Sequence, residues 1–223
     1  MDGYVRITRL SYRDDGRVLV SLTVGNESGS EDIEFLILRE LFDELFDERF
    51  DGRFDELPNG DVELYAVGQL EELADVTAAY SSACASLAFT QCSAKALFRK
   101  LLIKGFSRSA AEAAVELCKS RGYIDEDAMA HRRAEIMVEK LWGRVRILTK
   151  LREEGFSDSA MESALEFLEG VDFGEVCSRV ILKKYRVIPE DRLEREKMYA
   201  SLARLGFSRS DIREAIKMVK DDL

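Results

Sequence analysis

Three segments in the second half of the chain repeat one spacing of apolar residues. Each segment follows a Gly-Phe-Ser sequence, and apolar side chains stand six, nine, ten and thirteen positions after the glycine. These residues are Ala111, Ala114, Val115 and Cys118, then Met161, Ala164, Leu165 and Leu168, then Ile212, Ala215, Ile216 and Val219. Because an i, i+3, i+4, i+7 spacing places side chains on one face of an α-helix, the pattern predicts three amphipathic helices.

The turn in front of each helix repeats as well. Gly105, Gly155 and Gly206 lie 50 and 51 residues apart, a period typical of supersecondary units that stack on one another. Each glycine is expected in the left-handed conformation just after a helix, with the following phenylalanine packed in the core.

The serines after each glycine are suited to cap the next helix. Ser109 with Glu112, and Ser159 with Glu162, have the spacing of a capping box. The third copy lacks this pair, because Arg213 stands where the acid would be.

The residues between these turns complete a three-helix unit. The pattern predicts a helix over residues 125–141, a break at Trp142 and Gly143, and a new helix that ends at Gly155. We expect tandem repeats over residues 68–141, 142–186 and 187–223, the last cut short by the end of the sequence. The predicted fold is mainly α, with three-helix repeats forming an elongated, curved array.

The first third of the chain has a different, period-two pattern. Residues 4–12 and 17–24 read as two strands joined by an Asp-Gly turn. Residues 33–46 could be a short strand or a helix, and the spacing of their leucines favours a helix. A turn is expected at residues 58–60, a strand over 61–66, and a helix from residue 69. Residues 1–67 are thus predicted to form a small β-rich module.

The net charge of −10 is unevenly divided along the chain. Residues 1–75 contain 20 acidic and 7 basic side chains, a balance of −13, whereas residues 76–223 contain 23 acidic and 26 basic ones, a balance of +3. The four cysteines show no metal-ligand spacing, and the sequence shows no secretion signal or membrane-length apolar run. We therefore expect a cytoplasmic protein with no membrane segment.

Residues that could carry catalysis are sparse. His131 is the single histidine and has no sequence neighbour suited to a triad or a metal site, and no phosphate-binding GxxxxGK[ST] loop is present. The sequence therefore predicts no enzyme activity, no catalytic residues, no cofactor and no metal site.

Basic side chains in the repeats are the better candidates for function. They fall in clusters near predicted helix ends, and stacking of the repeats could align them into one stripe facing phosphates or an acidic protein surface. Such clusters are about as often only a solvated face. The candidates are Lys100, Lys104, Arg132, Arg133, Arg144, Arg146, Lys150, Lys183, Lys184 and Arg186.

Taken together, the ordered motifs of residues 80–223 resemble the RecX family of bacterial recombination regulators. The motifs are Lys104-Gly105-Phe106-Ser107, Gly122-Tyr123-Ile124-Asp125-Glu126, Gly143-Arg144-Val145-Arg146-Ile147, Lys183-Lys184-Tyr185 and Leu205-Gly206-Phe207-Ser208. Two positions depart from the family pattern: Met129 stands where an aromatic residue is usual, and Trp142 where a basic residue is common.

The resemblance implies a non-enzymatic regulator that binds the RecA recombinase filament on DNA. Members oppose growth of that filament and reduce its strand exchange, ATP hydrolysis and co-protease activity, which affects homologous recombination, DNA repair and the SOS response. For this chain we expect a monomer that binds single- or double-stranded DNA only weakly by itself. Two alternatives stay open on the residues alone, a helical DNA-binding protein and a scaffold for another helical partner.

Overall fold

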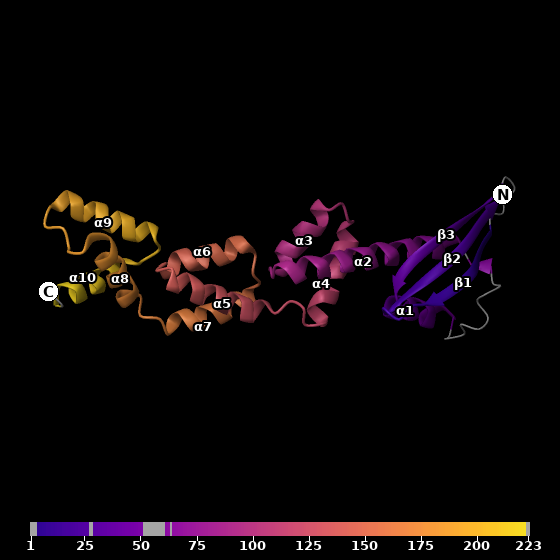
Figure 1. The fold of residues 1–223 in the computed structure, drawn as a ribbon, viewed down its shortest axis with the longest axis horizontal. Coiled ribbons are helices and arrows are strands. Elements are labelled where there is room, and N and C mark those ends of the chain that lie inside the picture. The colour runs from indigo at the N-terminus through magenta and orange to yellow at the C-terminus, as the bar shows by residue number, and fades with distance from the viewer. Residues whose placement is uncertain (1–3, 27–28, 51–60, 63, 222–223) are drawn as a thin grey trace. The chain divides into compact units, whose positions relative to one another are not determined.

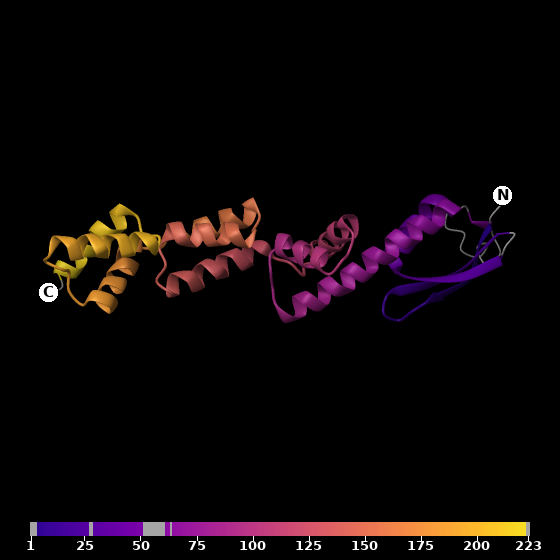
Figure 2. The ribbon, with the colours of Figure 1, turned by 90° about the horizontal axis from the view of Figure 1, so that it is seen from above.

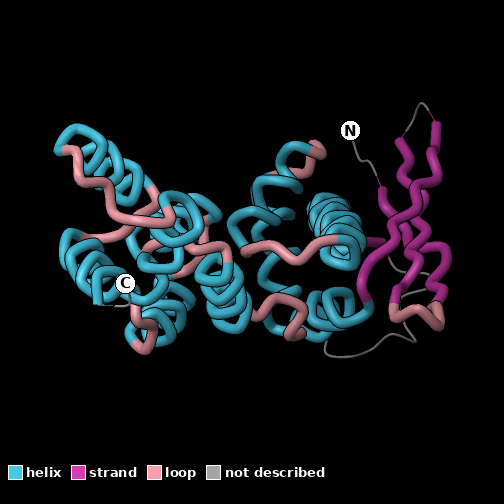
Figure 3. The backbone as a smooth tube through the Cα atoms, turned by 60° about the vertical axis from the view of Figure 1, so that its left-hand side comes forward, coloured by secondary structure: helices cyan, strands magenta, loops and turns pink. Residues whose placement is uncertain are grey.

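The computed structural model describes residues 4–26, 29–50, 61–62 and 64–221 (Figure 1). The chain divides into two compact units. The first unit comprises residues 1–91 and 97–123, and the second comprises residues 92–96 and 124–223. Strands occur only in the N-terminal part of the described chain, and the remainder is helical (Figure 3). A mainly α fold with a small β-rich N-terminal module is therefore confirmed.

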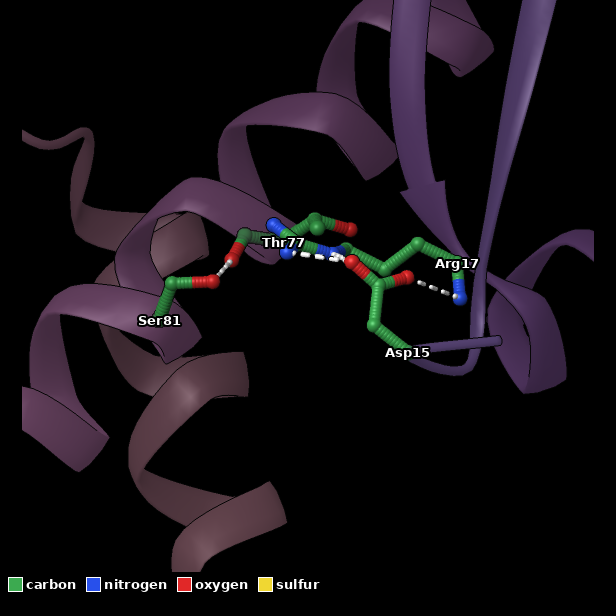
Figure 4. A network of polar contacts seen from close by, with 4 residues as sticks. All are labelled: Asp15, Arg17, Thr77 and Ser81. Carbon is green, nitrogen blue, oxygen red and sulfur yellow. Dashed lines mark hydrogen bonds and ion pairs between the residues drawn. The ribbon is translucent and has the colours of Figure 1, made fainter. Parts of the chain in front are cut away.

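The sheet of the first unit is antiparallel, with strand order β3-β2-β1-β4. Its strands are β1 (Tyr4–Tyr12), β2 (Arg17–Asn26), β3 (Gly29–Leu38) and β4 (Asp61–Val62). The predicted hairpin between the first two strands is confirmed, and Gly16 in its turn has a φ of 76°. Asp15 in the same turn accepts a hydrogen bond from Nε of Arg17 at 2.9 Å, which holds the pKa of that carboxyl below its ordinary value (Figure 4).

The leucine spacing favours a helix over residues 33–46, but these residues do not form a single helix. Residues 33–38 complete β3, and helix α1 (Arg39–Phe50) begins only after them. Phe35 and Ile37 are buried, whereas Leu36 between them is half-buried and Glu34 before them is exposed, so these residues follow the period-two pattern of a strand. The strand expected over residues 61–66 is likewise shorter, because helix α2 begins at Leu64. The turn expected at residues 58–60 lies outside the described residues.

Helix α2 (Leu64–Phe89) packs on the sheet and on a later helix of the first unit, α4 (Arg108–Ser120) (Figure 2). Leu70 on α2 is buried with the sheet residues in one core. Further along, the hydroxyl of Thr77 accepts a hydrogen bond from the amide of Leu38 at 2.9 Å, and Ser81 donates to the Thr77 carbonyl (Figure 4). The expected boundary between residues 67 and 68 falls inside this helix, so a separately folding residue 1–67 module stays a prediction.

The remaining helices follow in order along the chain. They are α3 (Ala94–Ile103), α4 (Arg108–Ser120), α5 (Glu126–Glu139), α6 (Arg144–Glu154), α7 (Asp158–Glu169), α8 (Phe173–Tyr185), α9 (Arg192–Arg204) and α10 (Arg209–Asp221). The strongest pairings are α2 with α4, α5 with α7, and α8 with α10. Grouping the helices as α2–α4, α5–α7 and α8–α10 gives three triplets that begin at residues 64, 126 and 173. The repeat bounds 68–141, 142–186 and 187–223 stay a prediction.

The repeated turns have the conformation that the sequence predicted. Gly105, Gly155 and Gly206 have φ angles of 94°, 80° and 92°. The apolar stripes that follow are buried, except that Leu165 and Ile216 are half-buried. Of the three phenylalanines in these turns only Phe207 is fully buried, and the other two are half-buried.

The serines that cap these helices lie two residues earlier than the expected capping-box serines Ser109 and Ser159. Ser107 and Ser157 accept hydrogen bonds from the amides of Ala110 and Ala160, because each helix begins directly after the Gly-Phe-Ser turn. The third copy, in which no capping box was expected, has a reciprocal pair. Ser208 accepts from the amide of Asp211 at 3.1 Å, and the Asp211 carboxylate accepts from the amide of Ser208 at 2.7 Å.

Candidate functional site

A basic groove lies in the second unit between α6 and the turn that joins α9 to α10. Its volume is about 490 Å³. One wall is formed by α6 and the residues before it, and the other by the end of α9. The lining residues are Trp142, Val145, Arg146, Thr149, Lys150, Glu153, Ala203, Arg204 and Gly206. We call this feature the α6–α9 groove.

Backbone contacts hold the two walls together. The amide of Gly143 donates to the carbonyl of Leu205 at 2.8 Å, and the amide of Val145 donates to the carbonyl of Gly206 at 3.1 Å. Two orphan amides at the start of α6 are thus satisfied by carbonyls at the end of α9. This contact needs glycine on both sides: a Cβ on Gly143 would overlap the backbone of Gly206, and one on Gly206 would overlap Arg146.

Cationic side chains dominate the α6–α9 groove. The guanidinium of Arg146 lies over the indole of Trp142, 3.8 Å from the ring centroid, which is cation–π geometry. Lys150 lies one turn further along α6, and Arg204 is exposed on the opposite wall. The single carboxylate of the lining, Glu153, is 3.4 Å from Nζ of Lys150. Both partners of that pair are well exposed, so the pair contributes only about 0–1 kcal/mol and leaves Lys150 available.

This combination of groups is suited to bind anions. Arginine can donate two parallel hydrogen bonds to a carboxylate or a phosphate, and lysine adds a point charge. The indole beside them can contact a planar group such as a base or a peptide unit. The α6–α9 groove can therefore bind an acidic or phosphate-bearing partner.

Arg144 does not belong to this groove, although the sequence grouped it with Arg146 and Lys150. Its Nη2 donates to the carbonyl of Leu168 at 2.8 Å, and its guanidinium lies 5.3 Å from the ring centroid of Phe173. Arg144 therefore satisfies a carbonyl at the end of α7 and packs on the start of α8. Its described contacts are structural.

The other basic candidates are dispersed over both units. Lys100 and Lys104 are in the first unit; Lys100 is half-buried, and Nζ of Lys104 contacts the hydroxyls of Ser82 and Ser86 at 2.7 and 3.1 Å. Arg132 and Arg133 are exposed on α5, and Nε of Arg133 lies 3.5 Å from Glu154.

Lys183, Lys184 and Arg186 are exposed at the C-terminal end of α8. Nζ of Lys184 lies 2.7 Å from the hydroxyl of Ser201 and 5.2 Å from the centroid of the Tyr185 ring. Cations at this end of a helix also interact favourably with its dipole. The structure thus brings together only Arg146 and Lys150 from the ten candidates in the α6–α9 groove.

Two residues of the groove were not identified as candidates from the sequence. Arg204 occurs in the third copy of the repeated segment, Leu-Ala-Arg-Leu-Gly-Phe-Ser, and was not named as a candidate. Trp142 was noted only as a departure from a family pattern. The repeat itself was the available signal. Arg204 stands just before the third Gly-Phe-Ser turn, and that turn packs against the start of α6.

His131, the single histidine, is half-buried on α5. Its ring lies 4.8 Å from the ring of Phe167, and its Nε2 is 3.6 Å from Glu135. Across the residues that the structure describes, no helix is both long enough and apolar enough to cross a membrane.

Comparison with curated proteins finds several that are named regulatory protein RecX. The protein of Stenotrophomonas maltophilia strain K279a is 29% identical over 131 residues, which is 58% of this chain and 80% of that protein. The protein of Xanthomonas axonopodis pv. citri strain 306 is 31% identical over the same shares. The protein of Chlorobium phaeobacteroides strain BS1 is 28% identical over 57% of this chain and 83% of its own length. No family model matches the chain.

Solved structures show the same fold. A crystal structure of a regulatory protein RecX has a TM-score of 0.71 at 19% identity, and the match covers 97% of this chain and 99% of that one. A crystal structure of RecX from Lactobacillus salivarius has a TM-score of 0.57 at 20% identity and covers 66% of this chain and 97% of that one.

Proposed function

Because the chain belongs to the RecX family of regulatory proteins, we propose that it is a non-enzymatic regulator of the RecA recombinase. It binds the RecA–DNA filament in the cytoplasm and opposes filament extension, ATP hydrolysis and strand exchange. Through these steps it modulates homologous recombination and DNA repair.

The observation that carries this proposal is the α6–α9 groove. It presents Arg146, Lys150 and Arg204 around the face of Trp142, with one carboxylate among them. A nucleoprotein filament offers phosphates along its DNA and carboxylates on its protein, and both are ligands for such a surface. The remainder of the chain after residue 75 has a balance of only +3, so affinity for DNA alone should be weak.

A protein that reads duplex DNA through its helix corners fits the structure less well. A recognition helix needs polar side chains that face outward near its N-terminus. Ala110 and Ala111 on α4, and Ala160 and Met161 on α7, are all buried instead. The first turns of these helices are therefore used for packing.

The test compares three ligands in one binding assay. The full chain is titrated against RecA alone, against a single-stranded oligonucleotide alone, and against RecA assembled on that oligonucleotide. The proposal predicts the tightest binding to the assembled filament, by at least about tenfold over either component, since contacts to protein and DNA combine there. Equal affinity for naked DNA and filament would favour the DNA-binding alternative. No binding to any form containing RecA would refute the proposed function.

A further inference from the structure

Two cysteines lie at the interface between α2 and α4 in the first unit. Cys118 on α4 is completely buried, and Cys84 on α2 is half-buried. Both carry free thiols in the structure. The function proposed above makes no use of either residue.

The register of the two helices brings these cysteines to the same level. At the beginning of α4, the hydroxyl of Ser107 donates to the carboxylate of Asp75 on α2 at 2.7 Å. Cys118 is eleven residues after Ser107, and Cys84 is nine residues after Asp75. Since both helices rise about 1.5 Å per residue, parallel helices in this register place the two cysteines near one another.

The residues around the cysteines are small. Ala79 and Ala83 on α2, and Ala111 and Ala114 on α4, are all fully buried. Ala114 stands one helical turn before Cys118, and Ala83 is the neighbour of Cys84, so the alanines flank the pair. Alanine allows two helix backbones to approach closely, and a disulfide requires Cα atoms about 4.4–6.8 Å apart.

The pKa of the Cys118 thiol agrees with this placement of Cys84. Burial, then the charge of Cys84 and a hydrogen bond to it, raise the pKa of Cys118 to about 12. Cys84 also hydrogen-bonds the hydroxyl of Tyr80, one turn earlier on α2, and helps to raise the pKa of that phenol. The same hydroxyl accepts a hydrogen bond from Arg121, which also pairs with Glu40.

We propose that Cys84 and Cys118 are a redox pair that closes to an intramolecular disulfide when the chain meets a peroxide. The half-buried Cys84 sulfur attacks one peroxide oxygen, the O–O bond breaks, and a sulfenic acid and one water are formed. The Cys118 sulfur then attacks the Cys84 sulfur, the S–O bond breaks, and the hydroxyl leaves as a second water with the Cys118 proton. Both thiols are oxidised by one electron each, and the peroxide is reduced by two.

The bond would join α4 to the helix that covers the sheet. The first unit would then have a covalent link between its helical part and its β-rich part, in addition to the packing of α2. A thiol reductant would reverse the link by exchange.

The test uses the full chain, excess hydrogen peroxide, and a count of free thiols after denaturation in the absence of reductant. The parent should lose two of its four thiols, its mass should fall by two hydrogens, and dithiothreitol should restore both. A digest with trypsin and chymotrypsin should give one cross-linked pair containing Cys84 and Cys118. Cys92→Ser is the matched control and should still lose two thiols, whereas Cys84→Ser and Cys118→Ser should form no intramolecular disulfide.

Several results would overturn the inference. One is a parent that keeps four thiols, or that gains oxygen without forming a disulfide. Another is a cross-link through Cys92 or Cys177, or between two chains. Because the parent and Cys92→Ser give these readings by themselves, misfolding of the other variants would leave the test intact.

Discussion

At the scale of single residues, Gly206 meets two independent demands. Its φ of 92° disfavours any side chain, and the backbone of Arg146 occupies the place of a Cβ. Gly155 has a similar φ of 80°, but the backbone of another segment does not crowd it. A Cβ there would meet only the flexible side chain of Lys95, at 2.9 Å. The two glycines are equivalent in the repeat and differ in what surrounds them.

We therefore expect Gly206→Ala to destabilise the second unit more than Gly155→Ala does. Strain at positive φ costs about 1 kcal/mol in both variants, and the backbone overlap at Gly206 should add about 1–3 kcal/mol. Trp142 is the single tryptophan and lies in the second unit, so urea unfolding followed by its fluorescence reports on this unit. Equal midpoints for the two variants would show that the close approach is not constraining.

Arg144 and Arg146, both on α6, should differ in whether their removal affects mainly stability or mainly binding. Arg144→Ala removes the donor to the Leu168 carbonyl and should cost about 1–2 kcal/mol of stability, because that carbonyl loses its partner. Arg146→Ala should cost less stability and weaken binding to the RecA–DNA filament more. Urea midpoints and filament affinities of the two variants are compared side by side. The reverse order of effects would mean that Arg144 is the contact residue.

At the scale of elements, the local pattern was enough for the helices and turns of the repeats. Spacing of apolar residues and the Gly-Phe-Ser turns identified the stripes of α4, α7 and α10. The local pattern was not enough for residues 33–38, because their apolar residues fit both an alternating strand and one face of a helix. Pairing with β2 determines that a strand forms. Nor could it show the α6–α9 groove, whose walls meet through Gly143 and Gly206, far apart in sequence.

The α8–α10 interface provides a test by pH. Burial of Cys177, followed by the charge of Asp211, raises the pKa of the thiol from 9.0 to about 12. The folded state therefore retains this proton between pH 9.0 and about 12 while the unfolded state loses it, and stability of the second unit should fall as pH rises through that window. Other groups titrate there too, so the comparison is with Cys177→Ala, whose Trp142-detected urea midpoint should fall less steeply. Parallel curves for parent and variant would contradict this.

At the scale of the whole molecule, the division of charge should control binding to naked DNA. Residues 1–75 have a balance of −13, and an acidic segment repels phosphates most where screening is weak. Neutralising Glu31, Asp32 and Glu34 on β3 to Gln, Asn and Gln keeps their acceptor oxygens for Ser21 and Thr23. We expect this variant to bind a single-stranded oligonucleotide several-fold more tightly at about 50 mM salt, with the difference shrinking at about 300 mM. Fluorescence anisotropy measures it, and unchanged affinity at low salt would exclude repulsion by β3.

The α6–α9 groove is most directly tested by inhibition of the DNA-dependent ATPase of RecA. Arg146, Lys150 and Arg204 are changed together to Glu, and the matched control changes Arg192, Lys197 and Lys220, which are exposed on α9 and α10 outside the groove lining. Both variants alter the net charge equally. The groove variant should need at least about tenfold more protein for half-inhibition, since each lost ionic contact at an interface is worth about 1–3 kcal/mol, while the control should stay within about twofold. A groove variant that inhibits like the parent, or a control that loses as much, would contradict the assignment of the groove as the filament contact.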